Sequence, residues 1–138
     1  MARKATRLTG GCLCGGVRYV VTGRPSPVVN CHCGQCRRWH GHHGAYATIG
    51  RAAVRLAQDQ GLSWYQSSAK ARRGFCRICG SSLFWERLGG SDIDIAAGTL
   101  DAPTGLATVR HIFTADQGDY YVIADGLPQL PGEWPGAG

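Results

Sequence analysis

The sequence predicts a mainly β fold of several short antiparallel strands. The chain has 138 residues, of which 21 are glycine, and glycine is more typical of tight turns than of helix interiors. Its apolar residues occur in short runs rich in β-branched and aromatic side chains, bounded by turn-forming residues. The sequence has no long apolar repeat at helical spacing, which argues against a helical bundle.

Several segments have the composition of strands. The first, Val17–Val21, combines valine with tyrosine and ends at the turn signal Gly23-Arg24-Pro25. Three segments with short connections are expected to form a meander: Ala45–Ile49, Ala53–Leu56 and Leu62–Gln66. The other predicted strands are Val28–Asn30, Ser81–Trp85, Ile93–Ala97 and Val109–Phe113.

The length fits one domain, which we expect over residues 9–130. The N-terminus, residues 1–8, is basic with little to bury, and residues 131–138 are rich in proline and glycine, so both ends are expected to be flexible. No segment has the apolar length of a signal peptide or a membrane span. We therefore expect a soluble, cytoplasmic protein without a membrane partner.

The seven cysteines predict metal binding. They form close pairs and a triplet instead of a spread disulfide framework, and the reducing cytosol would keep them as thiols. The triplet is Cys31-His32-Cys33-Gly34-Gln35-Cys36. In an extended segment Cys31 and Cys33 share a face, and Gly34 lets the chain turn back to bring in Cys36. Three thiolates leave the fourth position of a tetrahedral zinc ion open.

Two further cysteine pairs are expected to build one closed four-thiolate site. Cys12 and Cys14 lie between pairs of glycines, and Cys76-Arg77-Ile78-Cys79-Gly80 has the Cys-x-x-Cys spacing of a zinc knuckle. A redox-active Cys-x-x-Cys is the alternative, but it requires a βαβ context that the sequence does not supply.

Histidines follow the triplet closely. Any of His32, His40, His42 or His43 can be a fourth ligand or a proton shuttle, although a hydrogen-bonded loop histidine is the simpler interpretation of each. In an extended segment His32 points away from the face that its neighbouring cysteines share.

The formal net charge of +6 raises the question of a nucleic-acid partner. Five arginines adjoin the cysteine motifs, where cations would stabilise anionic zinc–thiolate centres. They are Arg37, Arg38, Arg72, Arg73 and Arg77. Much of the positive charge is then local compensation, and nucleic acid is not the expected partner.

The ordered cysteine motifs resemble those of the glutathione-dependent formaldehyde-activating family, also called the GFA or centromere-protein-V-like domain. The resemblance spans roughly Thr9 to Leu130. The motifs that carry it are Gly11-Cys12-Leu13-Cys14-Gly15-Gly16-Val17-Arg18-Tyr19, Cys31-His32-Cys33-Gly34-Gln35-Cys36-Arg37 and Phe75-Cys76-Arg77-Ile78-Cys79-Gly80-Ser81-Ser82-Leu83-Phe84. Later similarities are Gly98-Thr99-Leu100-Asp101, His111-Ile112-Phe113 and Asp125-Gly126-Leu127-Pro128.

The resemblance implies an Mss4-like, or β-tent, zinc-binding fold with two zinc ions per chain. The structural zinc would take the two pairs, Cys12, Cys14, Cys76 and Cys79, and the catalytic zinc the triplet, Cys31, Cys33 and Cys36. The implied activity is that of a carbon–sulfur lyase acting on a thiol–aldehyde adduct, as in the formation of S-(hydroxymethyl)glutathione from glutathione and formaldehyde. A small-molecule thiol such as glutathione is then the expected partner.

The triplet suits this chemistry on physical grounds, because a thiol at the open zinc position is held as the nucleophilic thiolate. Three thiolates already make the site anionic, so we favour activation of a thiol over polarisation of the aldehyde. His32, or a loop histidine, would assist proton transfer.

Two other functions stay open. A non-catalytic zinc-binding module would use its arginines to bind a protein or nucleic-acid partner, with salt-dependent binding in the second case. A metal-storage or redox-sensing site is the other, since exposed thiolates are oxidisable.

Overall fold

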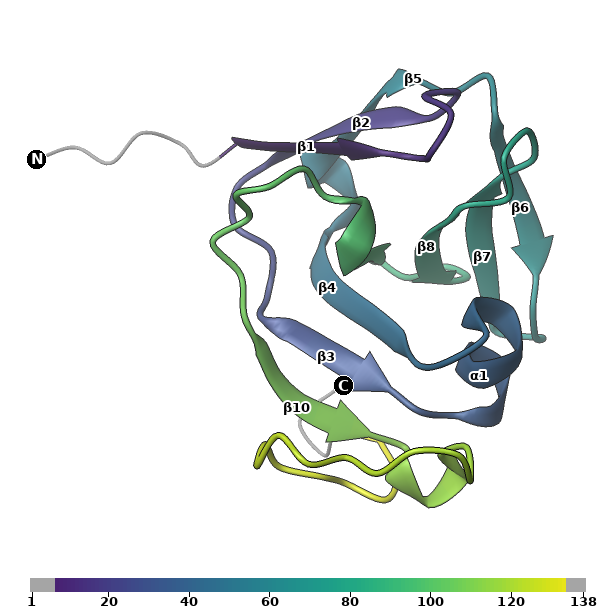
Figure 1. Ribbon diagram of the computed structural model, residues 1–138. Coiled ribbons are helices and arrows are strands. Elements are labelled where there is room, and N and C mark those ends of the chain that lie inside the picture. Colours follow the sequence, from purple (N-terminus) through teal and green to yellow (C-terminus); the bar gives the residue numbers. More distant parts are fainter. Residues whose placement is uncertain (1–6, 134–138) are drawn as a thin grey trace, which may run out of the picture. The chain divides into compact units, whose positions relative to one another are not determined.

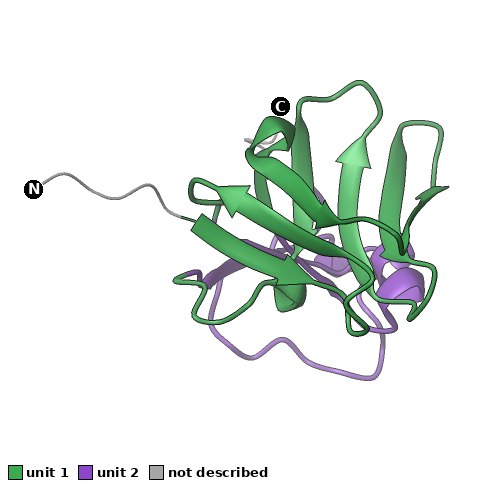
Figure 2. Ribbon diagram, turned by 90° about the horizontal axis from the view of Figure 1, so that it is seen from above, with its two compact units in different colours: residues 1–26, 47–105 green, residues 27–46, 106–138 purple. Residues whose placement is uncertain are grey.

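The computed structural model describes residues 7–133 and is mainly β, as the sequence predicts (Figure 1). These residues form two compact units, which Figure 2 distinguishes by colour. Unit 1 contains residues up to 26 and residues 47–105, and unit 2 contains residues 27–46 and those from 106 onwards. Each unit thus joins two separate segments of the chain. The single domain over residues 9–130 stays a prediction.

Unit 1 contains two antiparallel groups of strands. The first has the order β1 (Arg7–Gly11), β2 (Arg18–Thr22), β5 (Val54–Gln58). The second has the order β9 (Asp92–Ala96), β8 (Ser82–Arg87), β7 (Ala71–Cys76), β6 (Leu62–Gln66). Two short 3-10 helices, η1 (Arg51–Ala53) and η2 (Ala97–Thr99), also belong to unit 1.

The predicted meander is wrong. β5 pairs with β2 and β6 pairs with β7, so these two strands belong to different groups although they follow each other in sequence. The prediction lacked β7, because Arg72-Arg73-Gly74 interrupts any apolar pattern. β7 pairs with the whole length of β6, from Leu62 opposite Cys76 to Gln66 opposite Arg72.

The core of unit 1 lies between aromatic and aliphatic side chains of both groups of strands. Tyr19 of β2 and Phe84 of β8 are almost fully buried, and their rings meet edge to face with centroids 5.2 Å apart. This geometry is favourable for aromatic pairs beyond the area that they bury. The Tyr19 hydroxyl is hydrogen-bonded to Thr99 Oγ1 at 2.6 Å, which satisfies its polar end.

Unit 2 is built around β3 (Val28–Cys31). β3 pairs in parallel with β10 (Thr108–Ile112) and antiparallel with residues 44–46 of β4 (Gly44–Gly50). The parallel pair departs from the purely antiparallel expectation, and it sets His111 beside Asn30. A 3-10 helix, η3 (Thr114–Asp116), follows β10.

The helix α1 (Gly34–His40) was not predicted, because the sequence suggested a turn followed by a loop. Two local features explain it. The Cys33 sulfur caps the helix by accepting the backbone N–H of Cys36 at 3.3 Å. Gly41 ends it in the left-handed conformation, at φ 79°, with its N–H on the Arg37 carbonyl oxygen.

The structure describes only part of the two chain ends that the sequence predicts to be flexible. β1 begins at Arg7, so Arg7 and Leu8 form part of a strand instead of a flexible N-terminus. The carbonyl oxygens of Pro131 and Gly132, in the predicted tail, accept backbone hydrogen bonds. Residues 1–6 and 134–138 lie outside the described residues. Over residues 7–133, no helix is long and apolar enough to cross a membrane.

Candidate metal centres and a histidine-lined pocket

The two predicted cysteine pairs come together in unit 1. The sulfur atoms of Cys12, Cys14, Cys76 and Cys79 all lie within 4.8 Å of one another. Cys14 Sγ is 3.7 Å from Cys12 Sγ and 3.8 Å from Cys76 Sγ, too far for a disulfide bond of about 2 Å. A tetrahedral zinc ion with Zn–S bonds near 2.3 Å separates its sulfurs by about 3.8 Å. The four thiols therefore fit a tetrahedral metal ion.

Backbone turns hold these sulfurs in place. Cys12 Sγ accepts the Val17 N–H at 3.2 Å and Cys14 Sγ accepts the Gly16 N–H at 3.4 Å. On the other knuckle, hydrogen bonds to Ser81, whose hydroxyl lies 3.2 Å from the Cys79 sulfur, lower the pKa of Cys79 to about 5. Hydrogen bonds from N–H and O–H groups stabilise thiolates, which are the metal-binding form.

The triplet forms a second group, in unit 2. Cys31 ends β3, Cys33 caps α1, and Cys36 is buried in the first turn of that helix. Their sulfur atoms also lie within 4.8 Å of one another. This group too can hold a metal ion, with three protein thiols.

Close contacts among the thiols of the triplet shift the pKa values of Cys33 and Cys31 in opposite directions. Hydrogen bonds from the Cys31 and Cys36 thiols, and then from backbone N–H groups, lower the pKa of Cys33. Hydrogen bonds with the Cys33 and Cys36 thiols, followed by burial, raise the pKa of Cys31.

The histidines near the triplet do not complete it. Within residues 7–133, no histidine nitrogen joins the three sulfurs to form a larger group of ligand atoms. His40 is hydrogen-bonded to the Tyr46 hydroxyl at 2.6 Å, and His42 to the Tyr120 hydroxyl at 2.7 Å. His32 and His43 lie in a pocket of the same unit.

Two of the arginines predicted to balance the thiolates have other partners. Arg72 forms an ion pair with Glu86 at 2.5 Å, and its guanidinium carbon lies 3.9 Å from the centroid of the Trp64 ring. Arg77 donates to the carbonyl oxygen of Gln60 at 2.8 Å.

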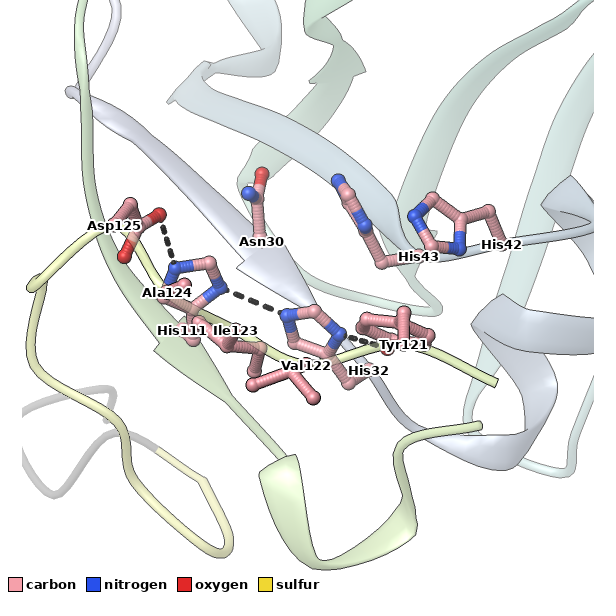
Figure 3. A pocket seen from close by; sticks show the side chains of 10 residues that line it. All are labelled: Asn30, His32, His42, His43, His111, Tyr121, Val122, Ile123, Ala124 and Asp125. Atoms are coloured by element: carbon pink, nitrogen blue, oxygen red, sulfur yellow. Dashed lines mark hydrogen bonds and ion pairs between the residues drawn. The ribbon is translucent and has the colours of Figure 1, made fainter. Parts of the chain in front are cut away.

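The pocket of unit 2 encloses about 260 Å³ (Figure 3). Four of its side chains are imidazoles, and residues 121–125, which follow η3, also line it. It is lined by Asn30, His32, His42, His43, His111, Tyr121, Val122, Ile123, Ala124 and Asp125. Asn30 and His32 are two positions apart, so they point to one side of the extended chain while Cys31 points to the other.

A continuous chain of hydrogen bonds crosses this pocket, as Figure 3 shows. Tyr121 Oη is hydrogen-bonded to His32 Nδ1. His32 Nε2 is 2.8 Å from His111 Nδ1, and His111 Nε2 is 2.7 Å from Asp125 Oδ2. Asp125 Oδ1 in turn accepts the Leu127 N–H at 3.0 Å. The chain therefore links a phenol to a carboxylate through two imidazoles.

Burial differs along this chain of hydrogen bonds. His32 and His111 are only 2% and 3% exposed, whereas the Asp125 side chain is 44% exposed. Burial, with the neighbouring histidines, lowers the pKa of His32 to about 4. Backbone N–H groups and His111 lower the pKa of Asp125. The imidazole of His32 is thus neutral at pH 7, and the carboxylate is ionised.

Two buried polar atoms of the lining lack a hydrogen-bond partner within residues 7–133. They are Asn30 Oδ1 and His43 Nδ1. Buried polar atoms are nearly always paired, so unpaired ones in a pocket indicate a place for a ligand or water.

The sequence identified His32, His42 and His43 but gave no role to His111, Tyr121 or Asp125. These three lie 79 to 93 positions beyond His32, and no local pattern in the sequence predicts the contact. One feature of the sequence does bear on this contact. Side chains alternate in direction along Cys31-His32-Cys33, so His32 points away from its neighbouring cysteines, where other residues can bind it.

A family model described as glutathione-dependent formaldehyde-activating enzyme (GFA) matches residues 7–116 of the chain. A Schizosaccharomyces pombe protein described as an uncharacterized lyase is 27% identical over 84 residues, which cover 60% of this chain and 60% of that protein. The match thus spans less than two thirds of the yeast relative's length.

A crystal structure of a Rhodobacter sphaeroides protein has a similar fold. Its TM-score is 0.59 at 24% sequence identity, and the match covers 72% of this chain and 97% of that one. At this identity the likeness bears on the fold alone. Both cysteine groups lie inside the residues that the family model matches, whereas Tyr121 and Asp125 lie beyond them.

Proposed function

The chain belongs to the family of glutathione-dependent formaldehyde-activating enzymes, and from this membership we propose that it is a zinc-dependent carbon–sulfur lyase acting on a thiol–aldehyde adduct. The observation that carries the proposal is the triplet of Cys31, Cys33 and Cys36, whose three sulfurs converge without a fourth protein ligand among the described residues. The name of the yeast relative, a lyase, agrees with this reaction class.

Zinc is the metal that we assign to both groups, because thiolate donors favour it and tetrahedral geometry suits it. At the triplet it would supply a position where a small-molecule thiol such as glutathione is held as thiolate near neutral pH. At the four-cysteine group no position is left for a substrate, so we assign that metal a structural role.

We assign further roles to two residues near the triplet, Cys33 and His32. The Cys33 sulfur fixes the start of α1, and so holds Cys36 at the distance that the triplet requires. His32 lies between two ligands of the triplet in sequence, and its imidazole faces the pocket. We assign it to the transfer of the proton that leaves or joins the adduct hydroxyl group.

The test combines metal content with turnover. We expect about two zinc ions per chain in the wild type and one in Cys31→Ser. Exchange spectroscopy by NMR should show that the wild type accelerates the interconversion of glutathione, formaldehyde and their adduct above the uncatalysed rate, and that Cys31→Ser does not. Cys14→Ser is the comparison, because it alters the structural group and should lower the unfolding temperature instead.

The proposal fails if the wild type, loaded with two zinc ions, does not accelerate exchange with glutathione, cysteine or another small thiol. It fails equally if activity survives removal of the metal from the triplet. Salt-dependent binding of nucleic acid without turnover would favour the non-catalytic module.

A further inference from the structure

The chain of hydrogen bonds in the pocket has a direction. An ionised carboxylate can only accept, so His111 must carry its proton on Nε2, facing Asp125. In a neutral His111 the other nitrogen, Nδ1, is then an acceptor, and it receives the proton on His32 Nε2. His32 Nδ1 is left as an acceptor, and it receives the hydroxyl proton of Tyr121.

Both ends of the chain of hydrogen bonds line the pocket, and this order makes Tyr121 its proton-donating end. Its proton is directed to His32, so the remaining lone-pair capacity of its oxygen is available to a donor in the pocket. The other end, Asp125, is the exposed one. The four residues thus join the pocket to solvent through hydrogen bonds alone.

We propose that Tyr121 is a catalytic residue that exchanges a proton with the hydroxyl group of the adduct, and that His32, His111 and Asp125 are positioning residues that relay this proton to solvent. The proposal rests on the proposed function. It adds three residues, Tyr121, His111 and Asp125, to the His32 already assigned.

The position of Tyr121 fits this role. It is hydrogen-bonded to His32, whose neighbours in sequence are Cys31 and Cys33. Arg37 directly follows Cys36, and its charge acts on the Tyr121 hydroxyl. Burial raises the pKa of Tyr121, and Arg37 opposes that rise. The phenol therefore stays protonated at rest, beside the loop that carries the thiols.

The relay step balances in the cleaving direction. The hydroxyl proton of the adduct moves to Tyr121 Oη, and the phenol proton moves to His32 Nδ1. The proton on His32 Nε2 moves to His111 Nδ1, and the proton on His111 Nε2 moves to Asp125. The carbon–sulfur bond breaks with its electron pair on sulfur, giving a thiolate, and the carbon–oxygen bond becomes the aldehyde carbonyl. Asp125 then gives its proton to water. When the product thiolate is protonated by Tyr121, protons move back from water through Asp125, His111 and His32, and this return restores both starting tautomers. The synthetic direction is the reverse.

Both imidazoles exchange one neutral tautomer for the other in this step. No charged imidazole forms in the buried part of the pocket, where desolvation would penalise it. The unpaired Asn30 Oδ1 and His43 Nδ1 provide further hydrogen-bonding atoms for a polar ligand beside the relay.

The experiment compares two neighbouring tyrosines. Tyr121→Phe removes the hydroxyl group at the end of the relay, and Tyr120→Phe removes a hydroxyl group that is bonded to His42 outside it. We expect Tyr121→Phe to lower kcat about 100-fold, as loss of a general acid–base group does, with little change in KM, zinc content or melting temperature. Tyr120→Phe should keep the wild-type kcat.

Two substitutions of Asp125 separate proton transfer from structure. Asp125→Asn keeps an oxygen that accepts from His111 but cannot take up a proton, so kcat should fall about 10-fold while the fold is retained. Asp125→Glu should recover most of the rate. Imidazole 15N NMR provides a readout besides activity: wild-type His32 and His111 should both carry their proton on Nε2.

Each outcome decides one of the two proposals. A wild type that binds two zinc ions without turnover overturns the proposed function, and with it the catalytic role of Tyr121. An active wild type with an equally active Tyr121→Phe overturns the relay alone. Nδ1-protonated tautomers at His111 or His32 also overturn the relay, because its direction would be reversed.

Discussion

Gly61 packs directly against the Cys76 sulfur, and its backbone is hydrogen-bonded to residues beside both cysteine pairs of unit 1. Its N–H donates to the Gly16 carbonyl oxygen at 2.8 Å, two residues beyond Cys14, and its carbonyl oxygen accepts the Arg77 N–H at 2.7 Å. A Cβ atom at Gly61 would lie 2.6 Å from Cys76 Sγ. The four-cysteine group therefore depends on a residue that carries no sulfur.

The substitution Gly61→Ala should weaken this metal centre. The methyl group must displace either the Cys76 sulfur or the Gly16 backbone, and overpacking of this kind costs about 1–3 kcal/mol. We expect faster release of one zinc ion to a colorimetric chelator and a lower melting temperature. Gly50→Ala is the matched control, because nothing lies within 4 Å of a Cβ atom there. Equal zinc release from both variants would contradict the role of Gly61.

The next prediction tests whether Arg72 stabilises the fold through Glu86 or acts on the cysteine thiolates. Its Nε donates to Glu86 Oε1 at 2.6 Å, and it packs over Trp64. Arg72→Gln should lower the free energy of unfolding by about 1 kcal/mol, because one partner of a largely buried carboxylate and a cation–π contact are lost. Zinc content should not change.

Chemical denaturation with parallel zinc analysis checks this prediction. Arg55→Gln, on an exposed position of β5, is the control and should change neither quantity. If Arg72→Gln loses zinc while its stability is retained, the arginine acts on the thiolates, as the sequence suggested, and the Glu86 pair is secondary.

The two groups of cysteines were predictable because their signal is local. Spacing and glycines mark each knuckle, and the pairing of Cys12 and Cys14 with Cys76 and Cys79 follows from the need for four ligands. Most strands were predictable for the same reason, since alternating apolar residues bounded by turns are visible over five or six positions.

What the sequence missed depends on contacts between distant residues or on unusual caps. α1 starts with a cysteine sulfur as its cap, and cysteine is not among the usual capping residues. β7 carries Arg73, which is 3% exposed, at a position where an apolar residue would have marked a strand. The chain of hydrogen bonds in the pocket joins His32 to His111 and Tyr121, and the parallel pairing of β3 with β10 brings His111 beside Asn30.

Asp94 of β9 should make stability fall as pH rises. Burial raises the pKa of its carboxyl group above the ordinary value, although the Thr48 hydroxyl, which donates to it at 2.6 Å, opposes the shift. Between the unfolded pKa near 3.9 and the raised folded pKa, the folded state binds more protons than the unfolded state. The free energy of unfolding therefore decreases with pH across this window, and the loss is complete above the folded pKa.

The substitution Asp94→Asn removes this penalty while it keeps an oxygen that accepts from Thr48. We expect the variant to melt a few degrees above the wild type at pH 8, and the difference to shrink as the pH falls through the raised folded pKa, where the wild-type carboxyl group becomes protonated. Asp59→Asn, in an exposed turn, should follow the wild type at every pH. A difference between Asp94→Asn and the wild type that is constant from pH 8 down to the unfolded pKa near 3.9 would show that the amide acts through packing, and that the buried charge has no cost.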